Sequence, residues 1–193
     1  MIFSHERAQK TANVLYIVFT VFYWLSIVLL VVVSLGFLVQ FILPKTLFQI
    51  SAKDFNFSFD NTIYFQSDLA ESINIQGFLQ KFSFFAIPLM FMLVVGLKHM
   101  RLILKSVKEG NPFCEANVKS LSIIGLDLIL AAFVVSLAEN VLFNHLLNLL
   151  SIRNITMNYS ANVPYLLAGI LVILLAGIFN YGRFLKSEYD ATV

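Results

Sequence analysis

The feature that most constrains this chain is its first apolar run, which extends over thirty residues from Val14 to Leu43 without a charged residue. A helix rises about 1.5 Å per residue, and about 20 apolar residues suffice to cross the hydrocarbon layer of a bilayer. The apolar core of a signal peptide has about 7 to 15 residues. We therefore interpret this run as an uncleaved transmembrane helix that follows a short basic leader.

Three further apolar runs follow, and the composition agrees with a membrane protein. Hydrophobic residues make up 59% of the 193 residues and charged residues 12%, whereas soluble domains contain about 25% charged residues. The sequence predicts an all-α membrane protein, a four-transmembrane-helix bundle that forms a single domain over residues 1–193. The predicted spans are 14–43, 82–104, 118–148 and 163–182.

The distribution of lysine and arginine predicts the orientation of these spans. Nine of the 13 lysines and arginines lie at the two ends of the chain and in the segment 98–119, and four lie in the other connections. Cytoplasmic segments of membrane proteins carry an excess of these residues. We therefore expect both termini in the cytoplasm, with a cytoplasmic loop over 105–117, a cytoplasmic tail over 183–193 and an extracytoplasmic loop over 44–81.

The extracytoplasmic loop contains a pattern typical of β-strands. Phe55, Phe57 and Phe59 alternate with polar residues, and a second short strand over 62–66 follows the Asp60–Asn61 pair, which suits a turn. The pattern predicts a β-hairpin with one phenylalanine face. This face would pack on the membrane surface or on the second outer loop, or it would receive a hydrophobic peptide or a lipid.

Basic residues at helical spacing follow the second apolar run. Lys98, Arg101, Lys105 and Lys108 recur every three or four residues, and Gly110 with the following Asn-Pro suits the end of a helix. The ordinary interpretation is a helix end that lies against anionic headgroups. The alternative is a docking surface for a cytoplasmic protein.

Two acidic residues fall within the third apolar run, where ionisable groups are costly and are candidates for function. Asp127 lies eight residues after Lys119, about 12 Å along a helix, and is therefore inside the membrane. Glu139 lies about 30 Å along the same helix, near the outer interface. We expect structural pairing of Asp127 with Lys98, Arg101 or Arg183, and of Glu139 with Lys81 or Arg153; a proton or cation pathway is the alternative.

The fourth run repeats Leu-Leu-Ala-Gly-Ile, so that Gly169 and Gly177 recur after eight residues. Eight residues are roughly two helical turns, which places both glycines near one helix face. Small residues let membrane helices approach closely. The repeat predicts either ordinary packing within the chain or a dimerisation face.

Motifs for catalysis and metal binding are absent from the sequence. It contains no Gly-x-Ser-x-Gly, phosphate loop or Asp-x-Asp calcium loop. The single cysteine, Cys114, excludes an internal disulfide, and the three histidines are widely separated. We therefore expect no enzyme activity, no cofactor, no metal site and, because the net charge is +2 with scattered basic residues, no direct binding of nucleic acid.

The segment 110–117 (GNPFCEAN) and the acidic C-terminal ending resemble a bacterial family of four-helix membrane proteins catalogued as domain of unknown function 2975. The segment contains Gly110, Pro112, Phe113 and Asn117 and is followed by Leu121, Ile124 and Gly125, and the ending contains Glu188, Asp190, Thr192 and Val193. Family members commonly have Ser or Thr, which cap helices well, where this chain has Cys114, so Asn111 or Asn117 is expected to take over that role. The resemblance implies a plasma-membrane location and a small helix-turn-helix DNA-binding protein as partner.

Three functions are consistent with these observations. The first is a non-enzymatic membrane sensor or regulator that holds such a DNA-binding partner through Arg101, Lys105, Lys108 and the family motifs. The second is a small transporter or channel that uses Asp127. The third is protection against a membrane-active peptide at the outer loop. The lipid bilayer is a partner in every case, and formation of a homo-oligomer is compatible with all three.

Overall fold

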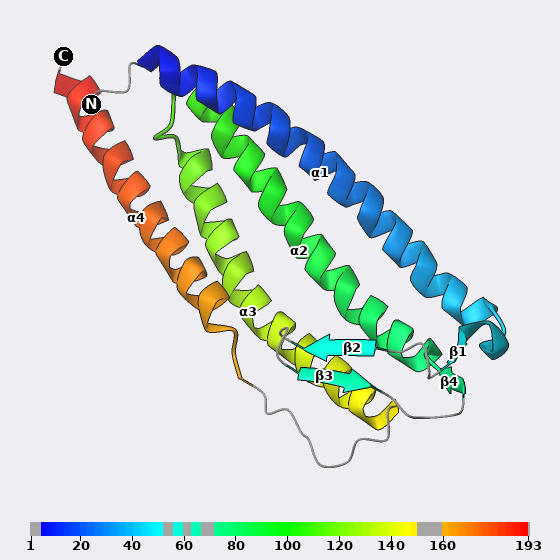
Figure 1. Cartoon of the computed structure of the whole chain (residues 1–193). Helices are drawn as coiled ribbons and strands as arrows, with labels where there is room; N and C mark the ends of the chain where they lie inside the picture. The colour runs from blue at the N-terminus through cyan, green and yellow to red at the C-terminus, as the bar shows by residue number, and fades with distance from the viewer. Residues whose placement is uncertain (1–4, 52–55, 60–62, 67–71, 150–159, 193) are drawn as a thin grey trace. The chain divides into compact units, whose positions relative to one another are not determined.

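The computed structural model describes residues 5–51, 56–59, 63–66, 72–149 and 160–192. Within this part of the chain, four long helices account for most residues (Figure 1). Their bounds are His5–Ile42 for α1, Gln76–Lys108 for α2, Glu115–Leu149 for α3 and Val163–Thr192 for α4. The prediction of four long apolar helices is therefore confirmed.

All four helices are long and apolar enough to cross a membrane. The helices extend beyond the predicted spans because charged residues outside the hydrocarbon layer are compatible with a helix. In particular, α2 includes the whole basic segment up to Lys108, and α3 begins at Glu115. The connection between α2 and α3 is consequently shorter than the predicted loop 105–117.

Large apolar side chains along the helices are mostly exposed. On α1, Val32, Leu35 and Leu38 each expose more than half of their surface. Exposed apolar area costs about 25 cal/mol per Å² in water, but lipid tails are as apolar as leucine. Helices that are surrounded by lipid tails are expected to expose apolar side chains in this way.

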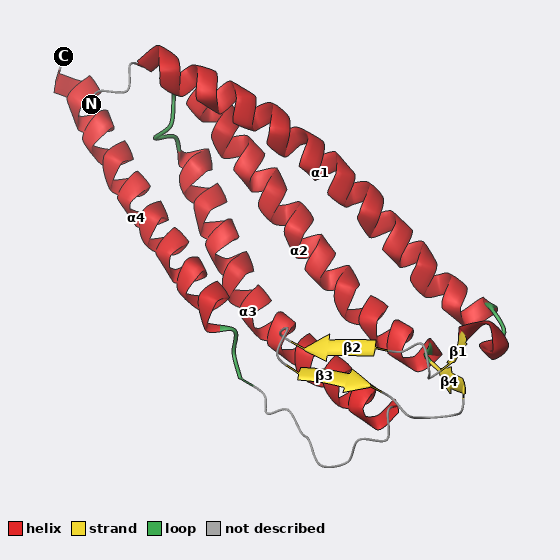
Figure 2. Cartoon of the chain, in the orientation of Figure 1, coloured by secondary structure: helices red, strands yellow, loops and turns green. Residues whose placement is uncertain are grey.

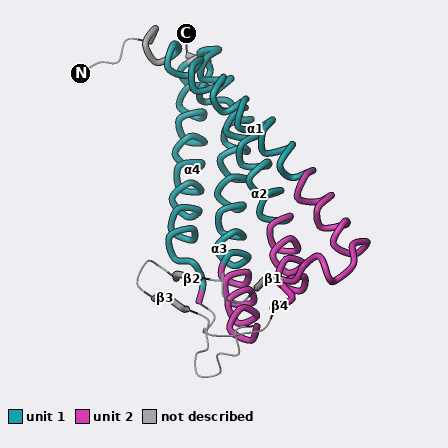
Figure 3. Tube along the Cα trace, turned by 45° about the vertical axis from the view of Figure 1, so that its right-hand side comes forward, with its two compact units in different colours: residues 1–31, 88–135, 161–193 teal, residues 32–87, 136–160 magenta. Residues whose placement is uncertain are grey.

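Internal contacts divide the chain into two compact units (Figure 3). Unit 1 comprises residues 1–31, 88–135 and 161–193, and unit 2 comprises residues 32–87 and 136–160. Unit 1 therefore contains segments of all four helices. Unit 2 contains the end of α1, the strands, the start of α2 and the end of α3.

Unit 2 contains a 3-10 helix (Lys45–Phe48) and two short antiparallel strand pairs. Strands β1 (Gln49–Ser51) and β4 (Ser72–Asn74) form one pair. Strands β2 (Asn56–Phe59) and β3 (Ile63–Gln66) form the other, with Phe57 opposite Phe65. The predicted turn at 60–61 and the face formed by the phenylalanine side chains lie outside what the structure describes, so the complete hairpin stays a prediction.

Polar side chains connect the helices within unit 2. The Gln40 side chain on α1 donates a hydrogen bond to Ser83 Oγ on α2 (3.1 Å), and the Gln76 side chain donates to the Gln40 backbone oxygen (2.7 Å). Lys81 Nζ lies 2.8 Å from Nδ1 of His145 on α3. Lys81 is therefore engaged by His145 rather than by Glu139, which is exposed, and Arg153, the other predicted partner of Glu139, lies outside the described residues.

Helices α3 and α4 approach closely in unit 1 at Gly125 and Gly169. A Cβ atom on Gly169 would lie 2.7 Å from the Gly125 backbone oxygen, and one on Gly125 would lie 2.9 Å from the Gly169 backbone oxygen. Both distances are too short for a carbon atom. Gly169 therefore has the packing role within the chain that the repeat predicted as one alternative, whereas a Cβ atom on Gly177 would meet nothing within 4 Å.

We expect Gly169→Ala to destabilise the protein by about 1 to 3 kcal/mol, because the added methyl group forces two backbones apart. The measurement is the free energy of unfolding in detergent micelles titrated with sodium dodecyl sulfate, followed by circular dichroism.

Gly177→Ala is the matched control, since it lies in an identical five-residue sequence on the same helix. The added methyl group enters open space and improves helix propensity, so this variant should be as stable as the wild type or slightly more stable. Equal destabilisation by both substitutions would contradict the assignment of the close contact to Gly169.

Candidate functional site

Helix α2 ends in a Schellman motif, the common helix ending in which glycine adopts a left-handed conformation. Gly110 has φ 78°. The Asn111 amide donates to the Ser106 oxygen (2.9 Å) and the Gly110 amide donates to the Val107 oxygen (3.1 Å). The predicted helix end at Gly110 is therefore present, and it turns the chain towards α3.

Asn117, in the first turn of α3, fixes this connection. Its side chain is 1% exposed. The Nδ2 group donates to the Pro112 backbone oxygen (2.7 Å) and to the Ser106 hydroxyl on α2. The Asn117 side chain therefore binds the loop and does not cap its own helix. The first backbone hydrogen bond of α3 runs from the Asn117 amide to the Cys114 backbone oxygen (3.1 Å).

Helix α4 contacts the same connection with both polar and aromatic groups. Lys186 Nζ donates to Asn111 Oδ1 (3.2 Å), and Arg183 pairs with Glu115 (3.0 Å). The Phe113 ring packs on Phe179 with 5.3 Å between ring centroids. Figure 2 shows the connection in green at the end of unit 1 where α4 ends.

We call this assembly the terminal surface and define it as residues 105–115 together with residues 179–186. Phe113 also covers Gly182, because a Cβ atom on this glycine would lie 2.9 Å from the Phe113 ring. Two segments that are about 70 residues apart in the sequence thus form one surface. Glu188 is exposed and belongs to the same helix, whereas the side chain of Asp190 lies outside the described part of the chain.

The predicted basic stripe divides into two parts. Arg101 faces α1, where its Nε donates to Thr20 Oγ1 (3.1 Å) and its guanidinium carbon lies 4.6 Å from the centroid of the Tyr23 ring. Lys105 and Lys108 are exposed. Lys105 lies 3.9 Å from Glu109, at a distance where an exposed ion pair is weak. Lys105 is therefore accessible for docking, whereas Arg101 connects two helices. Lys108 is exposed as well, and its Nζ lies 5.7 Å from the centroid of the Tyr16 ring on α1.

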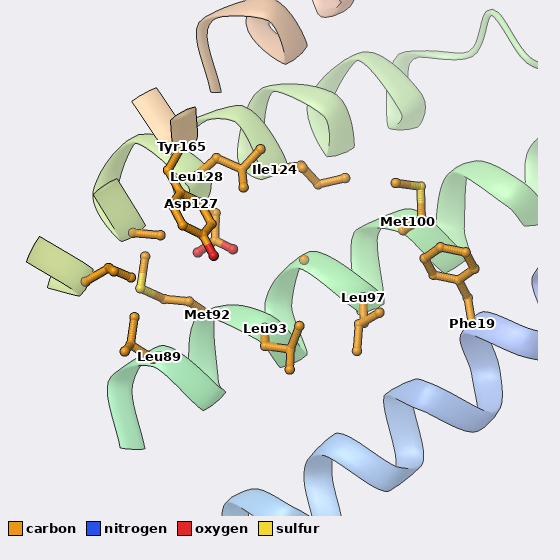
Figure 4. Close-up of a pocket in the computed structure, with 13 residues that line it drawn as sticks. Phe19, Leu89, Met92, Leu93, Leu97, Met100, Ile124, Asp127, Leu128 and Tyr165 are labelled. Atoms are coloured by element: carbon orange, nitrogen blue, oxygen red, sulfur yellow. The ribbon is translucent and has the colours of Figure 1, made fainter. Parts of the chain in front are cut away.

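Asp127 lies in unit 1 on α3, beside an apolar cavity (Figure 4). The predicted pairing with a basic residue is not found in the described part of the chain. Arg101 is engaged by α1, Arg183 is engaged by Glu115, and Lys98 is exposed. On α2, a Cβ atom added to Gly96 would lie 3.5 Å from Asp127 Oδ2.

Sequence reasoning missed two contacts made by histidines. His99 Nδ1 on α2 lies 3.1 Å from the Ser120 hydroxyl on α3 in unit 1, and His145 contacts Lys81 in unit 2. These pairs depend on how each helix is rotated about its axis. The residue spacing within one helix carries no such information about its neighbour.

The four apolar helices define the class of this protein, a multi-pass helical membrane protein. Residues 78–193 match the family described as "Protein of unknown function (DUF2975)", and the chain belongs to this family. The match includes the whole terminal surface and Asp127, and it confirms the resemblance found in the sequence. No curated protein and no solved structure matches the chain.

We expect Asn117→Leu to destabilise the protein by about 1 to 3 kcal/mol, because it leaves the Pro112 oxygen and the Ser106 hydroxyl without their buried donor. The measurement is the same unfolding titration in detergent, combined with hydrogen exchange of the amides at residues 106–118.

Cys114→Ser is the contrasting variant, since it changes a neighbouring side chain at the N-cap position of α3. A serine hydroxyl accepts a hydrogen bond from the helix start better than a thiol does, so this variant should be more stable by about 0.5 to 1 kcal/mol. If Asn117→Leu leaves stability and exchange unchanged, Asn117 does not fix the connection.

Proposed function

We propose that this chain is a non-enzymatic membrane regulator that holds a small helix-turn-helix DNA-binding protein at the terminal surface. The observation that carries the proposal is the joining of the α2–α3 connection to α4 by Lys186–Asn111, Arg183–Glu115 and Phe113–Phe179. A surface that is already ordered loses less conformational entropy when a partner binds. This order is what a preformed docking site requires.

The charge distribution supports the proposed side of the membrane. The terminal surface lies in the part of the sequence that is richest in lysine and arginine, and such segments are retained in the cytoplasm. Both the connection and α4 would then face a soluble cytoplasmic partner. In this arrangement the chain holds the DNA-binding protein at the plasma membrane, away from DNA, until that protein is released.

The accessible charges of the terminal surface suggest how the partner is recognised. Lys105 and Lys108 are exposed at the end of α2, and Glu115 is exposed at the start of α3. Charges at the edge of an interface act mainly on the association rate and on the choice of partner. Lys105 and Lys108 would therefore contact acidic side chains of the DNA-binding protein, while Arg101 would support the site by fixing α2 on α1.

The test is affinity purification of the full-length protein from its native membrane, followed by quantitative mass spectrometry of the proteins that remain bound. The wild type should retain one small helix-turn-helix protein. The double variant Lys105→Glu with Lys108→Glu should retain at least about tenfold less of it, equivalent to about 1.4 kcal/mol.

Lys45→Glu provides the matched control, because it makes the same charge change at an exposed lysine outside the terminal surface. It should retain the partner at the wild-type level. Undiminished recovery of the partner with the double variant, or a wild-type preparation that contains this chain alone, would contradict the proposal.

A further inference from the structure

Unit 1 contains an apolar cavity of about 370 Å³ with one acidic side chain. Segments of all four helices contribute to it, with Phe19 on α1, Met92 on α2, Asp127 on α3 and Tyr165 on α4. Figure 4 shows Asp127 and Tyr165 among the residues that line this cavity. Apart from Asp127 and the Tyr165 hydroxyl, every lining side chain is apolar, and the volume lies in the range of ordinary ligand sites.

The Asp127 carboxyl group has no basic partner among the described residues. On α2, Arg101 is held by Thr20 and Tyr23, and Lys98 is exposed. Gly96, which approaches Asp127, has no side chain. An ionisable group inside a membrane is costly unless a charge or a hydrogen bond compensates it. A ligand that brings a positive charge to this carboxylate would remove that cost.

We propose that this cavity binds a hydrophobic organic cation, with its positive group at Asp127 and its apolar part among Met92, Leu93 and Leu128. Aromatic rings on the wall favour the same ligand, because the faces of tyrosine and phenylalanine attract cations. Tyr165 lines the same cavity as Asp127, and Phe19 forms part of the wall on α1. Charge and shape thus select an ammonium compound with an apolar body.

A metal ion fits this cavity poorly. Calcium requires six to eight oxygen ligands and magnesium requires an octahedral set, whereas the cavity offers a single carboxylate and a single hydroxyl. Within the described residues, no group of three or more His, Cys, Asp or Glu residues is placed to hold a metal ion. The organic cation is therefore the occupant that the wall chemistry favours.

This inference is independent of the docking proposal, because it concerns Asp127 and the cavity rather than the terminal surface. Either proposal can fail while the other stands. The ligand would contact segments of all four helices in unit 1.

The experiment is equilibrium dialysis of the purified full-length protein in detergent against benzyltrimethylammonium. Neopentylbenzene, which has nearly the same shape with carbon in place of the charged nitrogen, is measured in parallel. We expect saturable binding of the cation at one site per chain and at least about tenfold weaker binding of the neutral compound. Asp127→Asn should weaken binding of the cation at least about tenfold, because it removes the charge and preserves the shape.

Two further variants separate the cavity from general effects of charge. Glu139→Gln removes an exposed acid from the same helix and should bind the cation as the wild type does. Ala131→Leu keeps Asp127 but fills part of the cavity and should weaken binding of both compounds. Circular dichroism and size-exclusion chromatography establish that each variant is folded.

Three results would overturn the proposal. These are wild-type binding of the cation by Asp127→Asn, equal binding of the neutral compound and the cation by the wild type, and the absence of saturable binding by the wild type. If Asp127→Asn does not fold, the comparison of the two compounds and the Ala131→Leu variant decide the question on their own.

Discussion

Every backbone amide in the hydrocarbon layer must find its hydrogen-bond partner within the protein, because lipid provides none. A helix meets this requirement within one segment, and the described chain accordingly consists mainly of four helices of 30 to 38 residues. Hydrophobic burial cannot hold such helices together, since lipid tails are equally apolar. Close packing at Gly125 and Gly169 and side-chain contacts such as Arg101–Thr20 therefore carry the association.

The terminal surface also depends on the need of backbone groups for hydrogen-bond partners. Where the helices end, backbone groups lose their helical partners, and side chains replace them. Asn117 binds the Pro112 oxygen, and the left-handed Gly110 closes the end of α2. The connection is short and ordered as a result, and α4 can pair with it through Arg183 and Lys186. The proposed docking site rests on this ordered connection.

The sequence predicted the number and approximate place of the helices because hydropathy reports directly on the solvent. It also predicted the end of α2 at Gly110, since only glycine adopts φ 78° without strain. The other helix ends and the contacts between helices could not be predicted. Arg101 has helical spacing with Lys105 and Lys108 and was therefore assigned to one stripe, yet it contacts α1. Such differences depend on helix rotation, which a single sequence does not contain.

A docking site for a cytoplasmic protein requires that the terminal surface faces the cytoplasm, and the most direct test is labelling with a membrane-impermeant maleimide. Two single-cysteine proteins in the Cys114→Ser background serve this purpose, with Glu109→Cys at the terminal surface and Lys45→Cys in the predicted outer loop; both positions are exposed. We expect Glu109→Cys to react in inverted vesicles and not in intact cells, and Lys45→Cys to show the opposite pattern. Reaction of Glu109→Cys in intact cells would contradict the account.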